Sequence, residues 1–314
     1  MDGTHDPELV SRFASYIERQ GKRYLSKLES VLSAGETDAV HDVRVASRRL
    51  AEPLRIAAGV GGGKRAERAA ELLGCTRRGL RRVRELDVLL ESLCDGSQAA
   101  GLDTQDLARL EGELTRQRDR AMAKARQACK RQKSPVAARM VRETARKLGC
   151  KAGKKVAGRI GSRLDGRYVK SLDRLIERDP REGATADLHA TRIYLKRLRY
   201  VVELSRDVSG IDRPELLKAL VGMQDLLGFW NDQLGAVTTI SKIARSPRNL
   251  SEDAGWSARL LAHCAGRLRD AERAREKAML QWEEFAACLV RHRSGRGATD
   301  AVSKSSESVI QPAS

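Results

Sequence analysis

The sequence is poor in aromatic residues and in proline. Only 4% of its 314 residues are Phe, Trp or Tyr, and seven are proline. Strands are enriched in aromatic and β-branched residues, so this composition argues against an all-β fold. Hydrophobic residues still make up 41% of the chain, which is enough for a folded core and excludes a wholly disordered chain. The abundance of Ala, Leu and Arg favours helices.

The six cysteines are scattered and form no Cys-x-x-Cys pair. Because cysteine metal sites use closely spaced ligands, we expect no metal site and reduced thiols. No run approaches the about 20 apolar residues that a membrane span needs, and the N-terminus lacks the features of a secretory signal. We therefore expect a cytoplasmic protein without a metal, a cofactor or a segment inserted into a membrane.

Positive charge is in clear excess. The chain has 60 Lys and Arg residues against 42 Asp and Glu residues, a formal net charge of +18. Residues 139–170 alone carry eleven basic and two acidic residues. Such a charge favours a polyanionic partner, which on this ground alone is a nucleic acid, an anionic membrane surface or another phosphate polymer. The alternative is a soluble protein that is merely rich in arginine.

Apolar residues recur at spacings of three and four along almost the whole chain, which is the pattern of amphipathic helices. Glycine and proline divide the chain into eight long segments. Helices are predicted at residues 7–33, 37–58, 64–95, 103–132, 135–178, 185–209, 213–245 and 252–292. We expect the fifth to break near Gly161 and Gly166, and Pro53 to kink the second.

One motif occurs twice. Residues 41–50 read H-x-x-R-x-x-x-R-R-L, and residues 189–198, which lie 148 positions later, read H-x-x-R-x-x-x-K-R-L. A weaker match joins residues 80–85 to 227–232 at an offset of 147. Two matches at nearly one offset indicate a duplicated unit of about four helices. The predicted fold is all-α, with two pseudo-symmetric four-helix bundles at residues 1–133 and 134–293. A disordered tail is predicted at 294–314.

The repeated helix has an apolar side and a basic side, since successive residues lie about 100° apart around a helix. The basic side of the first copy carries His41, Arg44, Arg48 and Arg55, and that of the second carries His189, Arg192, Lys196, Arg199 and Tyr200. Like charges three and four residues apart repel unless an anion lies between them. We therefore interpret this basic stripe as an anion-binding surface rather than as a solvated helix back.

The two histidines are predicted to lie in the first turns of their helices. Thr37 or Asp38 is a plausible N-cap before His41, and Thr185 or Asp187 before His189. Free backbone N–H groups in a first turn favour a nearby anion. This placement adds to the prediction of an anion-binding stripe.

The repeated motif is accompanied by L-R-x-V-R-E-L-D-V at 80–88, L-x-R-L-R-Y-x-x-E at 195–203 and Q-D-L-L-G-x-x-N-D at 224–232. In this order the motifs resemble the histidine-containing α-helical domain family known as CHAD. The resemblance implies two four-helix bundles related by a pseudo-twofold axis. It also implies that the basic helices face each other across a central basic cavity that binds inorganic polyphosphate, and that some members associate with polyphosphate granules.

Carried over position by position, the resemblance assigns polyphosphate binding to ten residues. They are His41, Arg44, Arg48, Arg49, His189, Arg192, Lys196, Arg197, Arg199 and Tyr200. Further basic candidates lie outside the motif. Arg55 is on the stripe, and the two predicted helices that follow carry Arg77, Arg78, Arg81, Arg84 and Arg120. The sequence departs from the family where Ala51 stands in place of a frequent Arg and where Arg81 replaces a glycine.

The predicted function is binding without catalysis. The chain has no H-E-x-x-H, G-x-S-x-G or paired-carboxylate arrangement, and the glycine-rich residues 59–65 lack the spacing and preceding strand of a phosphate loop. We expect a polyphosphate-binding protein, in the cytoplasm or at polyphosphate granules, and not an enzyme. The alternative is a sequence-independent nucleic-acid-binding protein, against which the scarcity of aromatic stacking platforms argues. The sequence carries no signal for the oligomeric state.

Overall fold

The computed structural model is a helical protein, and it describes residues 7–33, 36–94, 101–131, 134–151, 153–181 and 185–307. Within these ranges there is no strand, and the predicted all-α fold is confirmed. In the first half the helices are α1 (Pro7–Ser33), α2 (Thr37–Arg49), α3 (Ala51–Ala57), the π-helical segment η1 (Ala58–Gly62), α4 (Gly63–Gly79), α5 (Arg81–Cys94), α6 (Thr104–Arg131) and α7 (Ser134–Gly149). In the second half they are α8 (Lys154–Ile176), α9 (Thr185–Ser209), α10 (Pro214–Ala244), α11 (Pro247–Glu252), α12 (Ala254–Leu280) and α13 (Trp282–Glu307).

The predicted break within residues 135–178 is displaced. The chain leaves the helix after Gly149 and begins α8 at Lys154, whereas Gly161 and Gly166 lie inside α8. One face of α8 is buried over its whole length, including Ile160 and Leu164. Burial of this apolar face outweighs the cost of about 1 kcal/mol that each internal glycine imposes on a helix.

The predicted kink before Pro53 is confirmed. Helix α2 ends at Arg49 and α3 begins at Ala51, so the proline stands in the first turn of α3, where its missing N–H leaves no helical hydrogen bond unmade. After α3, Gly61 has a φ of 138° and Gly63 a φ of 55°. These left-handed values favour glycine and explain why the glycine run ends one helix and starts the next.

The helices form two similar groups. In the first, α7 packs on α1 and α4, and in the second, α13 packs on α8 and α10. The start of α13 lies 148 positions after the start of α7, which is the offset of the repeated motif. The predicted division into residues 1–133 and 134–293 stays a prediction. Ser134-Pro135 indicated a linker, but it begins α7, where proline is well tolerated.

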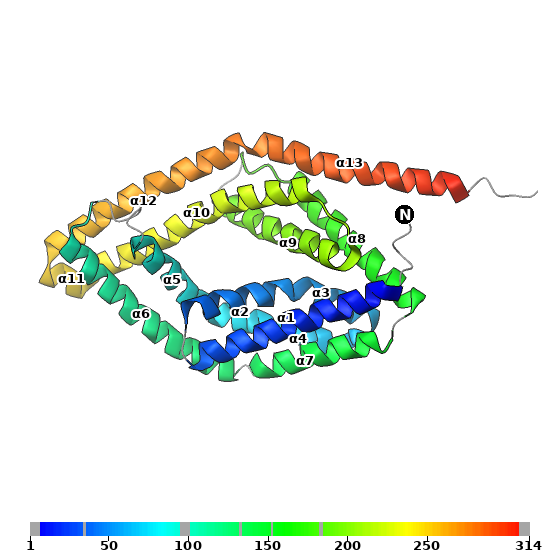
Figure 1. Ribbon diagram of the computed structural model, residues 1–314. Coiled ribbons are helices and arrows are strands. Elements are labelled where there is room, and N and C mark those ends of the chain that lie inside the picture. The colour runs from blue at the N-terminus through cyan, green and yellow to red at the C-terminus, as the bar shows by residue number, and fades with distance from the viewer. Residues whose placement is uncertain are drawn as a thin grey trace, which may run out of the picture.

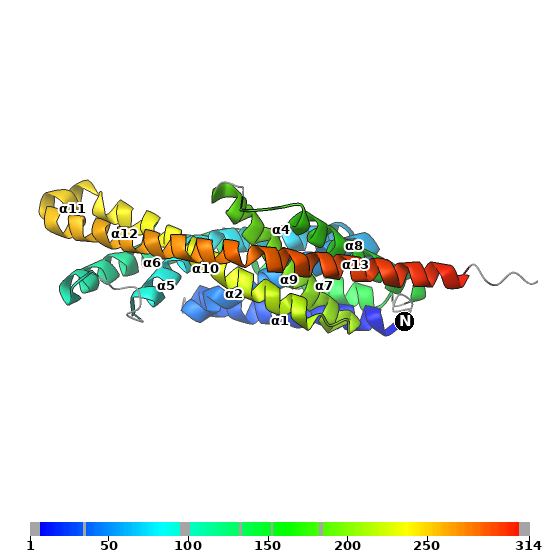
Figure 2. The ribbon, with the colours of Figure 1, turned by 90° about the horizontal axis from the view of Figure 1, so that it is seen from above.

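A single apolar core joins the two repeats. It includes buried residues from α1 to α4 and α7 to α10, and from the start of α13. A smaller cluster lies between α5, α6, α10 and α12, with Trp256 buried inside it. Figure 1 shows α12 and α13 along one edge of the molecule and α1 and α7 along the other. Figure 2 shows α11 and the paired ends of α10 and α12 projecting at one end.

The C-terminal region continues as helix beyond the predicted domain boundary. Helix α13 extends to Glu307, although disorder was predicted from residue 294, and residues 308–314 lie outside the described residues. The extent of a disordered tail thus stays a prediction. Among the described residues, no helix has both the length and the apolar character required to cross a membrane.

Candidate anion-binding site

The two repeated basic helices meet in the middle of the molecule. Helix α2 contacts α9, and Arg48 on α2 acts electrostatically on groups of both repeats. Burial lowers the pKa of five other basic groups, and the charge of Arg48 lowers each of them further: His41, Arg44, Arg77, Arg192 and Lys196. These five residues and Arg48 are called the central cluster below. The two stripes therefore lie close to each other.

Lys196 is the most strongly perturbed member of the central cluster. Burial, then the charges of Arg192 and Arg48, lower the pKa of its ammonium to about 7, against a smaller opposing effect of Asp232. The guanidinium of Arg44 has its pKa lowered to about 10, by burial and by Arg48. Such shifts arise where cations crowd together with too few carboxylates to balance them. A bound polyanion would supply the missing negative charge.

Two arginines at equivalent positions of the repeats are held by neighbouring helices. Arg44 Nη1 donates a hydrogen bond of 2.5 Å to the backbone carbonyl oxygen of Arg77 on α4. Arg192 Nη2 lies 3.7 Å from Asp232 Oδ1 on α10. The Nε of Arg192 is buried and has no hydrogen-bond acceptor within the described ranges. Both guanidinium groups are thus oriented and keep donors for an anion.

The two histidines also have equivalent neighbours. His189 Nδ1 lies 3.3 Å from Asn231 Oδ1, and burial and the charge of Arg84 lower the pKa of His41. Arg84 and Asn231 are 147 positions apart, so the weaker sequence match of the repeats corresponds to the residues beside the two histidines. The two repeats therefore place equivalent positions beside their histidines.

The predicted first-turn placement of the histidines is wrong. Glu36 is the N-cap of α2 and its side chain caps nothing, so α2 begins at Thr37 and His41 is its fifth residue. Helix α9 begins at Thr185, and His189 is likewise its fifth residue. By this position the backbone N–H groups are engaged within the helix. An anion beside these histidines would therefore meet their rings and not free backbone N–H groups.

Four of the predicted binding residues pair with the two buried carboxylates Glu52 and Glu203. Arg49 Nη2 lies 3.4 Å from Glu203 Oε2, and Arg197 Nε lies 3.9 Å from Glu52 Oε1. Each of these two pairs joins one repeat to the other. Arg55 also pairs with Glu52, and Arg199 Nε donates to Glu203 Oε1 at 2.8 Å. Because Glu52 and Glu203 are buried, these arginines first of all balance internal charge.

The remaining predicted residues lie around the central cluster. Tyr200 lies near Arg77. Burial and the charges of Arg48 and Arg55 lower the pKa of the Arg77 guanidinium, and Tyr200 raises it by a smaller amount. The other three residues, Arg81, Arg84 and Arg120, are less strongly supported as binding residues. Arg81 pairs with Glu85 at 2.7 Å, Arg84 with Glu91 at 2.9 Å, and Arg120 is exposed on α6.

Arg77 belongs to the central cluster, although the sequence indicated it only as a secondary candidate for binding. It lies at the end of α4, and the only sequence signal was its place among several basic residues at 77–84. Its counterpart at an offset of 147 is the buried Gln224, so the repeat gave no indication of its role. The electrostatic contact with Arg48 and Arg55 exists only in the folded chain.

Fold and site together define a class: an all-helical protein of two repeats that meet at a cluster of cations. Comparison with known families gives that class a name. A model of the CHAD domain family matches residues 15–241, and the chain belongs to the CHAD domain family. Members of this family are known to bind polyphosphate.

Solved structures show the same fold. The crystal structure of the CHAD domain from the plant Ricinus communis is 24% identical in sequence, with 86% of this chain and 91% of that chain covered and a TM-score of 0.60. PptA from Streptomyces chartreusis is 19% identical, with 87% and 99% covered and a TM-score of 0.58. No curated protein matches the chain.

Proposed function

We propose that this protein binds inorganic polyphosphate at the central cluster. The observation that carries the proposal is that Arg48 lowers the pKa of basic groups from both repeats, which means that partly buried cations of two helices lie close together. Polyphosphate carries a negative charge on every unit and is therefore matched to a row of closely spaced cations. Arginine binds phosphate oxygens through two N–H groups, and lysine acts as a point charge.

The residues have separate roles in this proposal. Arg48, Arg192 and Lys196 contact the polymer directly, and Arg44 is oriented toward it by its bond to the backbone of α4. His41 and His189 donate hydrogen bonds at the edge of the site. Arg49, Arg197 and the other residues paired with Glu52 and Glu203 hold the two repeats together, so their effect on binding is indirect.

We propose further that the site holds the polymer without cleaving it, and that the protein acts in the cytoplasm or at polyphosphate granules. The crowded cations favour the ground state of a polyanion along its whole length. An enzyme would instead bind the transition state of one bond better than the rest. Nucleic acid is a weaker ligand in this proposal because aromatic residues make up only 4% of the chain, and bases require stacking platforms.

A competition experiment tests the proposal. Labelled polyphosphate bound to the protein is displaced by unlabelled polyphosphate, duplex DNA or RNA. Polyphosphate is expected to compete best, with an affinity that falls steeply with salt, by about 0.7–0.9 log units per log unit of salt for each neutralised phosphate, by analogy with nucleic acids.

Arg48→Ala should weaken polyphosphate binding by about tenfold or more, as expected for loss of a charge-assisted contact. Arg68→Ala is the matched control, because Arg68 is exposed and pairs with Glu71 on the surface at 2.8 Å. Equal effects of the two substitutions, or stronger competition by DNA, would contradict the proposal.

A further inference from the structure

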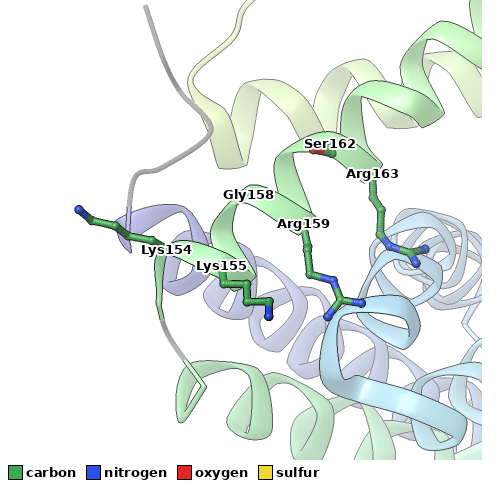
Figure 3. A pocket seen from close by; sticks show the side chains of 6 residues that line it. All are labelled: Lys154, Lys155, Gly158, Arg159, Ser162 and Arg163. Atoms are coloured by element: carbon green, nitrogen blue, oxygen red, sulfur yellow. The ribbon is translucent and has the colours of Figure 1, made fainter.

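A second group of cations lines a pocket on α8. The pocket is bordered by Lys154, Lys155, Gly158, Arg159, Ser162 and Arg163. Figure 3 shows the side chains of Lys155, Arg159 and Arg163 on one side of α8, whereas Lys154 points away. The three are spaced four residues apart, so each lies about 6 Å along the helix from the next. They form the α8 track, defined as Lys155, Arg159 and Arg163.

The charge of the α8 track is not balanced within the protein. All three side chains are exposed, and within the described ranges none of them forms an ion pair with a carboxylate. Many other exposed arginines of the chain do form such pairs, for example Arg273 with Asp270 at 2.7 Å. A row of like charges without counter-charges is unfavourable unless an anion binds it.

The glycine-rich η1 segment holds the last residue of the track in place. A Cβ atom added to Gly59 would lie 2.2 Å from Cζ of Arg163 and 2.3 Å from its Nη1. The guanidinium therefore lies directly against the backbone at Gly59, a position that only glycine leaves open. The glycine-rich residues 59–63, which resemble a phosphate loop only superficially, thus leave room at Gly59 for an arginine of α8.

The α8 track continues toward the central cluster. One turn beyond Arg163, Arg167 Nη1 lies 3.4 Å from Glu52 Oε2, and the same carboxylate pairs with Arg55. The pKa of Arg77 is lowered first by burial and then by the charges of Arg48 and Arg55. Because Arg77 belongs to the central cluster, Arg55 is close to that cluster. Cations therefore follow one another from Arg48 to the start of α8.

We propose that the α8 track binds the part of a polyphosphate chain that extends beyond the central cluster. Long chains then bind more tightly than short ones because they contact both groups of cations. This inference rests on the proposed function and adds a second contact region and a preference for chain length.

The test compares long-chain polyphosphate with tripolyphosphate, which is too short to contact both groups. The double substitution Lys155→Ala and Arg159→Ala is expected to weaken binding of the long polymer by about tenfold and to reduce its salt slope by about one for each side chain removed. Tripolyphosphate binding should stay unchanged, which also shows that the variant is folded. Arg273→Ala with Arg275→Ala on α12 is the control for loss of two positive charges.

The substitution Gly59→Ala tests the track without removing charge. Its methyl group displaces the guanidinium of Arg163, so binding of the long polymer should weaken while tripolyphosphate binding is retained. The inference is wrong if the double variant weakens both ligands equally, leaves the long polymer unaffected, or lowers affinity for duplex DNA alone. If Arg48→Ala also changes neither phosphate ligand, the proposed function itself fails, which separates the two hypotheses.

Discussion

The charge of Arg48 on α2 lowers the pKa of Lys196 on α9, after burial and the charge of Arg192. The two residues belong to different repeats and lie 148 positions apart. Each occupies the same place in its copy of the repeated motif. Their electrostatic interaction shows that two equivalent basic side chains of the repeats lie near each other in the folded chain.

Affinity for polyphosphate is expected to fall as the pH rises above 7. The pKa of Lys196 is about 7 in the free protein, and a bound polyanion raises it because it favours the charged ammonium. Below pH 7 the ammonium of Lys196 is protonated in both the free and the bound protein, so it does not make the affinity depend on pH. Between the free and bound pKa, binding takes up a proton, and affinity decreases by up to about tenfold per pH unit.

Calorimetry in two buffers of different ionisation enthalpy, at about pH 8, would measure this proton uptake. In Lys196→Arg the side chain stays charged across this range, so the uptake should disappear while binding is kept. Equal uptake in the wild type and in this variant would show that another group titrates.

Replacing Lys196 by Met should stabilise the free protein at neutral pH. The folded state lowers the pKa of Lys196 from 10.5 to about 7, so between these values the unfolded chain binds more protons and stability rises with pH. At pH 7 and below, the wild type carries the full cost of the crowded ammonium. Lys196→Met should raise the free energy of unfolding by about 0.5–2 kcal/mol, measured by urea denaturation, and should weaken polyphosphate binding.

The gain in stability should shrink as the pH approaches 10, where the lysine of the unfolded chain also loses its proton. A variant that is less stable than the wild type at neutral pH would contradict the crowding of cations at this position. Lys242→Met on α10, a lysine without a resolved role in the central cluster, is the comparison.

The substitutions Arg48→Ala and Lys196→Ala should not act independently. Each should weaken polyphosphate binding, and their effects in the double variant should differ from the sum by about 0.5–3 kcal/mol, because the two groups contact one ligand. A double-mutant cycle of binding free energies measures the difference. Additive losses and binding in two separate phases would mean that the two stripes are independent sites.

The buried carboxylate of Glu52 should matter more for stability than for binding. Its side chain is 5% exposed and pairs with Arg55, Arg167 and Arg197. Glu52→Ala leaves three partly exposed arginines without their shared carboxylate and should cost about 1–3 kcal/mol in the free energy of unfolding. Glu71→Ala removes an exposed pair with Arg68 and should cost about 1 kcal/mol or less. Similar costs in the two variants would contradict the structural role of Glu52.

The histidines are expected to bind polyphosphate and not to cleave it. His41→Gln or His189→Gln keeps a hydrogen-bond donor and should lose only part of the affinity, whereas Arg44→Gln or Arg192→Gln removes a charged group and should lose more. The chain length of polyphosphate incubated with the protein is followed over time. Release of orthophosphate by the wild type but not by the histidine variants would show that the histidines act in catalysis.

Much of the fold could be predicted because helices follow local periodicity. The spacing of apolar residues predicted α1 and α9 with the bounds that the structure shows. Tertiary packing decided where helices continue through glycine, as α8 does through Gly161 and Gly166. Ser134-Pro135 begins α7, and the local sequence could not show this because a Ser-Pro pair at a helix start and one in a linker look the same.

The candidate site was predictable to the extent that it follows the repeat. His41, Arg44 and Arg48 were predicted from their spacing and from their second copy, and the structure brings Arg48 together with Lys196. The binding role of these residues stays a prediction. Arg49 could not be separated from them in sequence, because its buried partner Glu203 belongs to the other repeat and no local pattern reports it.

The sequence by itself determined the helical character of this protein, its duplication and the basic side of the repeated helix, because periodicity and composition act over a few turns. Only the tertiary structure decided which cations lie among other cations and which face a carboxylate. That difference depends on residues far apart in the chain, such as Glu52 beside Arg197 and Gly59 beside Arg163. Charge interactions act through space, so identical arginines in one stripe acquire different roles once the helices pack.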